Sequence, residues 1–178
     1  YERRSDAITI GGAGAGDIIF ESVASSFNNA AEHVNITGPA TSSEPLVIVS
    51  VLDTACDTYQ KATAITETQT SNYNLNIDGN VVIIGCYLAI PRTTSIRQEC
   101  AARLIECTLE ELTSAGIVNV SNYGSSLKAE RCTFLGGSGK DLCLSASKGR
   151  VHIEGGSWNG FKTSVIKGSL GDLSSPFI

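Results

Sequence analysis

The chain contains no methionine, few charged residues and no long hydrophobic run. A natural chain starts with methionine, so we expect Tyr1 to be an internal or processed start and the sequence to be a fragment. Charged residues make up 17% of the chain, the formal net charge is -5 and lysine and arginine nowhere cluster, which argues against a nucleic-acid partner. No apolar run approaches the ~20 residues that span a bilayer, so we expect no membrane insertion.

Signatures of metal and cofactor sites are also missing. The six cysteines include no C-x-x-C pair, and neither of the two histidines has the spacing of a metal ligand. The glycine-rich run Gly11–Gly16 lacks the third glycine of a dinucleotide-binding turn, which favours an ordinary tight turn. We therefore expect no metal and no cofactor.

What the chain does have is internal repetition. Four segments share the pattern apolar-x-apolar-x-x-Cys/Gly-x-apolar, and they are 81–88, 102–109, 127–134 and 151–158. At the Cys/Gly position, from 86 to 107 is 21, from 107 to 132 is 25 and from 132 to 156 is 24. A second series gives a similar period, because from Ile117 to Leu142 is 25 and from Leu142 to Val165 is 23. Two series with one period indicate a solenoid.

The repeat predicts an all-β fold, a single-stranded right-handed parallel β-helix with about 21–25 residues per coil. Alternating apolar residues mark strands with one buried face, and the extra residue before the Cys/Gly position suits a corner. We expect regular coils over 73–178 and irregular first coils over 1–72, in one continuous domain. The irregular part has long loops at 38–45 and 53–71 and room for a short helix over 21–31.

Parallel stacking turns each repeat position into a column of side chains about 4.8 Å apart. Four inward columns follow, namely Val81/Ala102/Leu127/Val151, Ile83/Leu104/Ala129/Ile153, Cys86/Cys107/Cys132/Gly156 and Leu88/Leu109/Phe134/Trp158. They assign three cysteines to the core as free thiols, although an even cysteine count also suits disulfides in a secreted chain. They also predict that Trp158 packs on Phe134 rather than on a sugar.

The outward columns hold the candidate functional residues. One contains Arg103, Lys128 and His152, and the next contains Glu130 and Glu154. Paired carboxylates are what glycoside hydrolysis needs, so Glu130 and Glu154 are the candidate catalytic residues. A basic residue beside an acidic substrate is what a uronate lyase needs, so Arg103, Lys128 and His152 are the candidate ligand-binding residues. The alternative is an ion ladder on a solvated sheet face.

Two outward isoleucines, Ile84 and Ile105, stack on the same face with Tyr87 nearby. Stacked exposed apolar residues form a stripe that a partner subunit could cover. This stripe favours an oligomer, such as a cyclic homotrimer of side-by-side helices.

The four aligned coils, 81–158, resemble the pectin-lyase-like β-helix superfamily, and within it the shaft of a bacteriophage tailspike or tail fibre. The resemblance implies a virion tail component, assembled in the host cytoplasm and acting outside the cell, that binds a bacterial surface polysaccharide. We therefore expect a structural and receptor-binding segment rather than an enzyme. The alternatives are a polysaccharide depolymerase, either hydrolase or lyase, and a secreted bacterial adhesin. The superfamily's calcium-binding aspartates and catalytic arginine match no motif here, so none is carried over.

Overall fold

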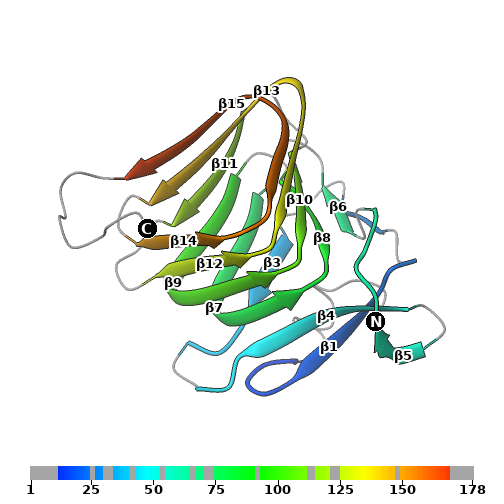
Figure 1. The fold of residues 1–178 in the computed structure, drawn as a ribbon. Helices are drawn as coiled ribbons and strands as arrows, with labels where there is room; N and C mark the ends of the chain where they lie inside the picture. Colours follow the sequence, from blue (N-terminus) through cyan, green and yellow to red (C-terminus); the bar gives the residue numbers. More distant parts are fainter. Residues whose placement is uncertain are drawn as a thin grey trace.

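The fold is a parallel β-solenoid of about three turns. A computed structural model of the chain describes residues 12–24, 27–29, 34–40, 43–52, 55–64, 67–69, 74–90, 93–111, 115–120, 125–146 and 149–168. Within these ranges the chain forms fifteen strands and no helix (Figure 1). The prediction of an all-β parallel β-helix is confirmed.

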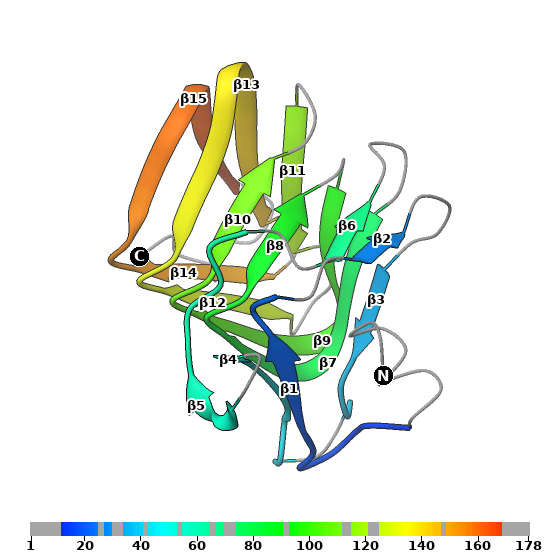
Figure 2. The same cartoon turned by 90° about the vertical axis from the view of Figure 1, so that its right-hand side faces the viewer.

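The coils stack into three faces, which we call A, B and C. Face A consists of β1 (Ile18–Ser22), β4 (Leu46–Leu52), the second halves of β7 (Asn74–Ile84) and β9 (Thr93–Ile105), β12 (Ser126–Glu130) and β14 (Arg150–Glu154). Face B consists of β2 (Phe27–Asn29), β6 (Glu67–Gln69), β8 (Tyr87–Ile90), β10 (Thr108–Glu111) and the beginnings of β13 (Thr133–Ala146) and β15 (Ser157–Gly168) (Figure 2).

Face C consists of β3 (Val34–Thr37), the first halves of β7 and β9, β11 (Ala115–Val120) and the ends of β13 and β15. All these pairings are parallel. The short strand β5 (Ala55–Tyr59) is the exception, since it pairs antiparallel with β4. Gly79 marks the corner where β7 passes from face C to face A, and its φ of 71° lies in the left-handed region that glycine adopts without strain.

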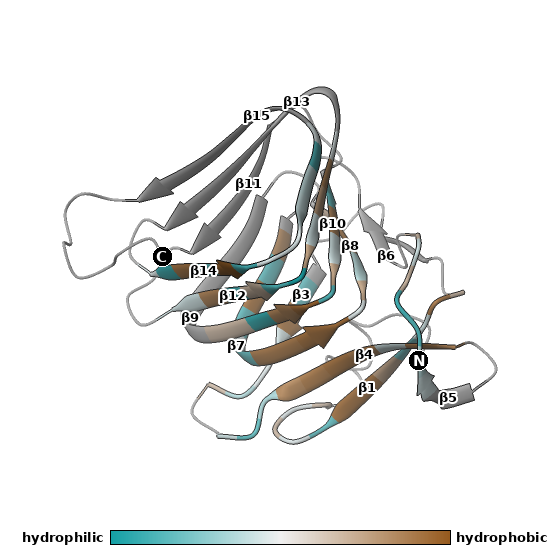
Figure 3. Cartoon of the chain, in the orientation of Figure 1, coloured by the Kyte–Doolittle hydropathy of each residue, from teal (hydrophilic) through white to brown (hydrophobic). Residues whose placement is uncertain are grey.

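The core fills the space between the faces. The register confirms all four predicted inward columns, because it aligns their members coil by coil. Their residues are buried except at the last coil, where Ile153 and Trp158 are only partly covered. Phe134 and Trp158 stack with ring centroids 4.3 Å apart and ring planes 16° apart, as expected from the sequence. Figure 3 shows hydrophobic segments along β1, β4 and β7.

The corner between faces A and B repeats in every regular coil. Its first residue has positive φ each time, at Gly85, Glu106, Arg131 and Gly155. The corner amides donate to the next coil: Glu106 N–H to the Glu130 carbonyl and Arg131 N–H to the Glu154 carbonyl, both at 2.8 Å. The residue after it is Cys86, Cys107, Cys132 or Gly156, and these three cysteines are free and buried, as predicted.

Three local predictions are wrong. On face C, Ile117 pairs with Cys143, and Cys143 pairs with Val165, so the aligned series that used Leu142 is one residue out of register. The helix expected over 21–31 is not formed by the residues described there, since Ser22 ends β1 and β2 follows. The loop expected over 53–71 contains β5 and β6.

The tight turn expected in the glycine-rich run is present. Asp17 N–H donates to the Gly14 carbonyl at 3.3 Å, and the Gly14 N–H returns a hydrogen bond to Asp17 Oδ2 at 2.9 Å.

Candidate binding surface on face A

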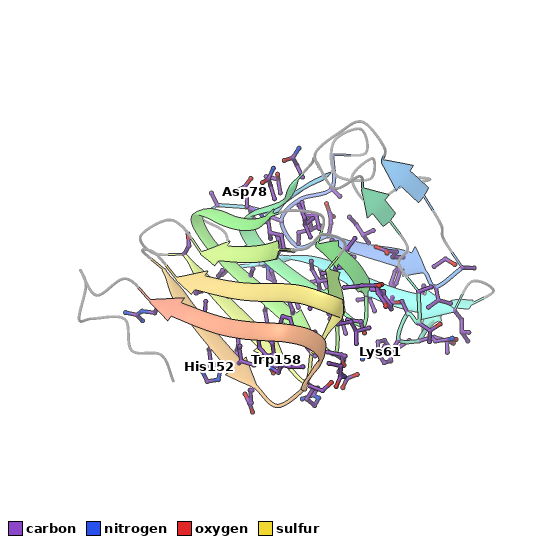
Figure 4. All side chains as sticks on the ribbon, turned by 90° about the horizontal axis from the view of Figure 1, so that it is seen from above. Lys61, Asp78, His152 and Trp158 are labelled. Carbon is purple, nitrogen blue, oxygen red and sulfur yellow. The ribbon has the colours of Figure 1, made fainter. Side chains whose placement is uncertain are left out.

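The register brings all five predicted site residues together on the outer side of face A. Arg103, Lys128 and His152 stack on β9, β12 and β14, and Glu130 and Glu154 stack beside them. Each alternates with inward core residues, so it points away from the core. In Figure 4, His152 and the face C residue Asp78 lie on opposite sides of the coil.

We call these five residues the charged ladder, because one network of ion pairs joins them. Arg103 binds Glu130 in bidentate fashion, with its Nε on Oε1 and its Nη2 on Oε2 at 3.0 Å. Lys128 Nζ lies 3.1 Å from Glu130 Oε1 and 3.4 Å from Glu154 Oε2. His152 Nε2 lies 3.9 Å from Glu154 Oε2. The ladder therefore links three successive coils.

Exposure separates the two glutamates. The side chain of Glu130 is 10% exposed and that of Glu154 is 65% exposed, whereas the three basic side chains are 41% to 49% exposed. A ligand approaching face A would therefore meet Arg103, Lys128, His152 and Glu154 before it met Glu130.

Glu130 is held as a carboxylate. Hydrogen bonds from Arg103, with a further contribution from Lys128, outweigh partial burial and lower its pKa to about 2. The same contacts raise the pKa values of Arg103 and Lys128. A general acid must carry a proton at the working pH, and the surroundings of Glu130 favour the opposite state.

A second cluster, which the sequence did not indicate, lies on the corner between faces A and B. Tyr59 Oη donates to Glu106 Oε2 at 2.8 Å, and Arg131 Nη2 lies 3.0 Å from Glu106 Oε1. Burial and the Glu106 contact raise the pKa of Tyr59, and the hydrogen bonds from Tyr59 and Arg131 lower the pKa of Glu106. The only sequence signal is that Glu106 and Arg131 each precede a column cysteine.

Toward the amino-terminal coils, the same face becomes apolar. Its outward columns continue from Ile105 through Ile84 and Val82 to β4 and β1, and they end in Val47, Val49, Ile18 and Phe20. Ile18 and Phe20 are 55% and 53% exposed, and the others are partly exposed. We call these seven residues the apolar half of face A. The stripe expected from Ile84 and Ile105 is thus part of a larger surface.

The residues that the structure describes contain no group of three potential metal ligands. None of the helices and strands described there is a helix long and apolar enough to cross a membrane. No family model matches the chain, and neither a curated protein nor a solved structure matches it. The fold therefore defines the class, a parallel β-solenoid with a charged ladder on one face.

Proposed function

We propose that this chain is a structural and receptor-binding segment of a phage tailspike or tail fibre of the pectin-lyase-like type, and that it binds bacterial surface polysaccharide along the charged ladder. The observation that carries the proposal is the stack of Arg103, Lys128 and His152, which presents half-exposed N–H donors at successive coils. A polysaccharide is an extended chain with many hydroxyl acceptors, so a donor column repeating every ~4.8 Å suits it.

The protonation state of Glu130 favours binding over cleavage. With a pKa of about 2, this carboxylate carries no proton to deliver to a glycosidic oxygen at neutral pH. A depolymerase remains the second candidate, because Glu130 and Glu154 are register neighbours on adjacent strands. Glu154 is the better exposed of the two and would have to supply the general acid.

The test is to measure binding of the purified chain to capsular polysaccharides and lipopolysaccharides from a panel of bacteria. The same mixtures are then analysed for glycan chain length by size-exclusion chromatography. For a glycan that binds, the double variant Lys128→Gln/His152→Asn should bind roughly tenfold more weakly, because each lost hydrogen bond is worth about 1 kcal/mol. Glycan length should stay unchanged.

Arg131→Gln is the matched control, because Arg131 is an exposed cation on the corner outside the ladder. It should bind like the unchanged chain. Equal affinity of the double variant and the unchanged chain would contradict the proposal. Shortened glycan chains that disappear in Glu154→Gln would establish the depolymerase instead.

A further inference from the structure

The apolar half of face A is a flat sheet surface that exposes its largest side chains. Among the described residues, the exposed large hydrophobic side chains are Ile18, Phe20 and Tyr59, and the first two lie in this half. Behind them, β4 and β7 contribute partly exposed valines and an isoleucine in the same two columns. Contiguous apolar surface of this kind marks a contact site, because water contact with it is unfavourable.

Charge identifies the occupant. The chain carries a net charge of -5, so two copies repel each other except where their facing surfaces are neutral. The apolar half has no charged residue among its seven positions. In the adjoining ladder, Arg103 and Lys128 pair with Glu130 and Glu154, which leaves no uncompensated charge. Face A is therefore the surface on which one copy meets another without like-charge repulsion.

The shape of the surface points to the same partner. A pleated face of β-branched side chains packs well against another such face, as the two sheets of a β-sandwich do at a spacing of about 10 Å. From these observations we infer that the apolar half of face A is a self-association surface, on which two copies of this chain pack in an isologous dimer. This inference does not rest on the proposed glycan binding.

A two-fold contact also explains how the face is divided. An isologous contact uses the same patch on both copies. If the axis passes through the apolar half, this half packs on itself and both charged ladders lie outside the contact. The ladders then keep the exposure that a ligand would need.

Sedimentation equilibrium of the chain over a wide concentration range tests the inference. A species of twice the chain mass should form, and it should persist at high salt, because an apolar contact is not screened as ion pairs are. Phe20→Ser should raise the dissociation constant about thirtyfold or more, since the lost aromatic contact occurs in both copies. The fold should tolerate this variant, because the Phe20 side chain points into solvent in the single chain.

Asn159→Ser is the control, since Asn159 is exposed on face B. It should leave the dissociation constant unchanged. The hydrodynamic outcomes are distinct. A monomer at every concentration would overturn the inference, and so would a dimer that Phe20→Ser does not weaken. A trimer would overturn the isologous arrangement, because each face would then have to meet a different surface of its neighbour.

Discussion

At the scale of single residues, Glu130 shows how the neighbours of a side chain decide its chemistry. By position it is half of a carboxylate pair, as a glycosidase would require. By contact it is the centre of an ion network, held by a bidentate arginine and a lysine. Only Arg103, Lys128 and His152 are left to interact with a ligand through N–H donors.

The lowered pKa of Glu130 makes stability depend on pH. Its pKa is about 2 in the folded chain against an ordinary value of 4.5, so the stabilisation it provides is complete above pH 4.5. As the pH falls from 4.5 to about 2, the folded state must also take up the proton and this stabilisation is lost. Glu130→Gln should therefore lower the free energy of unfolding at neutral pH, with a difference that shrinks across this window.

Urea unfolding of the unchanged chain and of Glu130→Gln, measured at a series of pH values, checks this prediction. Arg103→Gln is the reciprocal variant and should shift the same window, because it removes the first cause of the low pKa. A difference between Glu130→Gln and the unchanged chain that stays constant down to low pH would contradict the assignment.

At the scale of elements, the corner between faces A and B depends on two successive glycines in the last regular coil. Gly155 has φ of 66° and open space around it, the nearest atom to an added Cβ being Arg131 Cγ at 3.7 Å. Gly156 has φ of 98°, and an added Cβ would lie 2.0 Å from the Cys132 carbonyl oxygen. The two positions thus differ in crowding by the neighbouring coil.

Alanine substitution should separate these two effects. Gly155→Ala should cost about 1–2 kcal/mol of unfolding free energy, which is the strain of a left-handed backbone. Gly156→Ala should cost on the order of 3 kcal/mol or more, because the backbone of one coil must move. Both residues are exposed, so burial does not confuse the comparison. Equal losses in chemical denaturation would show that the close approach to Cys132 is relieved elsewhere.

The elements also show what the sequence could and could not predict. Faces A and B followed from the repeat, because apolar residues there alternate with polar ones and the inward parity is clear. On face C, Leu142, Cys143 and Leu144 are all apolar, so either parity fits and the alignment slipped by one residue. The early coils were obscured because from Leu46 to its partner Val81 is 35 residues, and β5 and β6 lie between them.

The candidate site divides in the same way. The stacking of the five ladder residues followed from the register, because register fixes the order of Cα positions. The burial of Glu130 and its bidentate contact depend on side-chain rotamers, which a repeat pattern does not determine. The Tyr59 contact with Glu106 joins residues from an irregular coil and a corner, and no periodic signal connects them.

At the scale of the whole molecule, a solenoid is stabilised by contacts between neighbouring coils, so the position of a residue along the axis decides how far a defect spreads. Leu104 lies in a coil with stacked neighbours on both sides and is 2% exposed. Trp158 lies in β15, which within the described part of the chain pairs only with β13. Its ring packs on Phe134 but remains partly exposed.

Hydrogen exchange read by mass spectrometry should distinguish these two positions. Leu104→Ala should cost about 2–5 kcal/mol, because it leaves a cavity in a central coil, and it should accelerate exchange in all the coils. Trp158→Leu removes the ring stack at one end, so exchange should accelerate in β14, β15 and the beginning of β13 while β7 and β9 keep their rates. Uniform acceleration in Trp158→Leu would mean that the coils unfold as one cooperative unit, and the quasi-one-dimensional account of this solenoid would then be wrong.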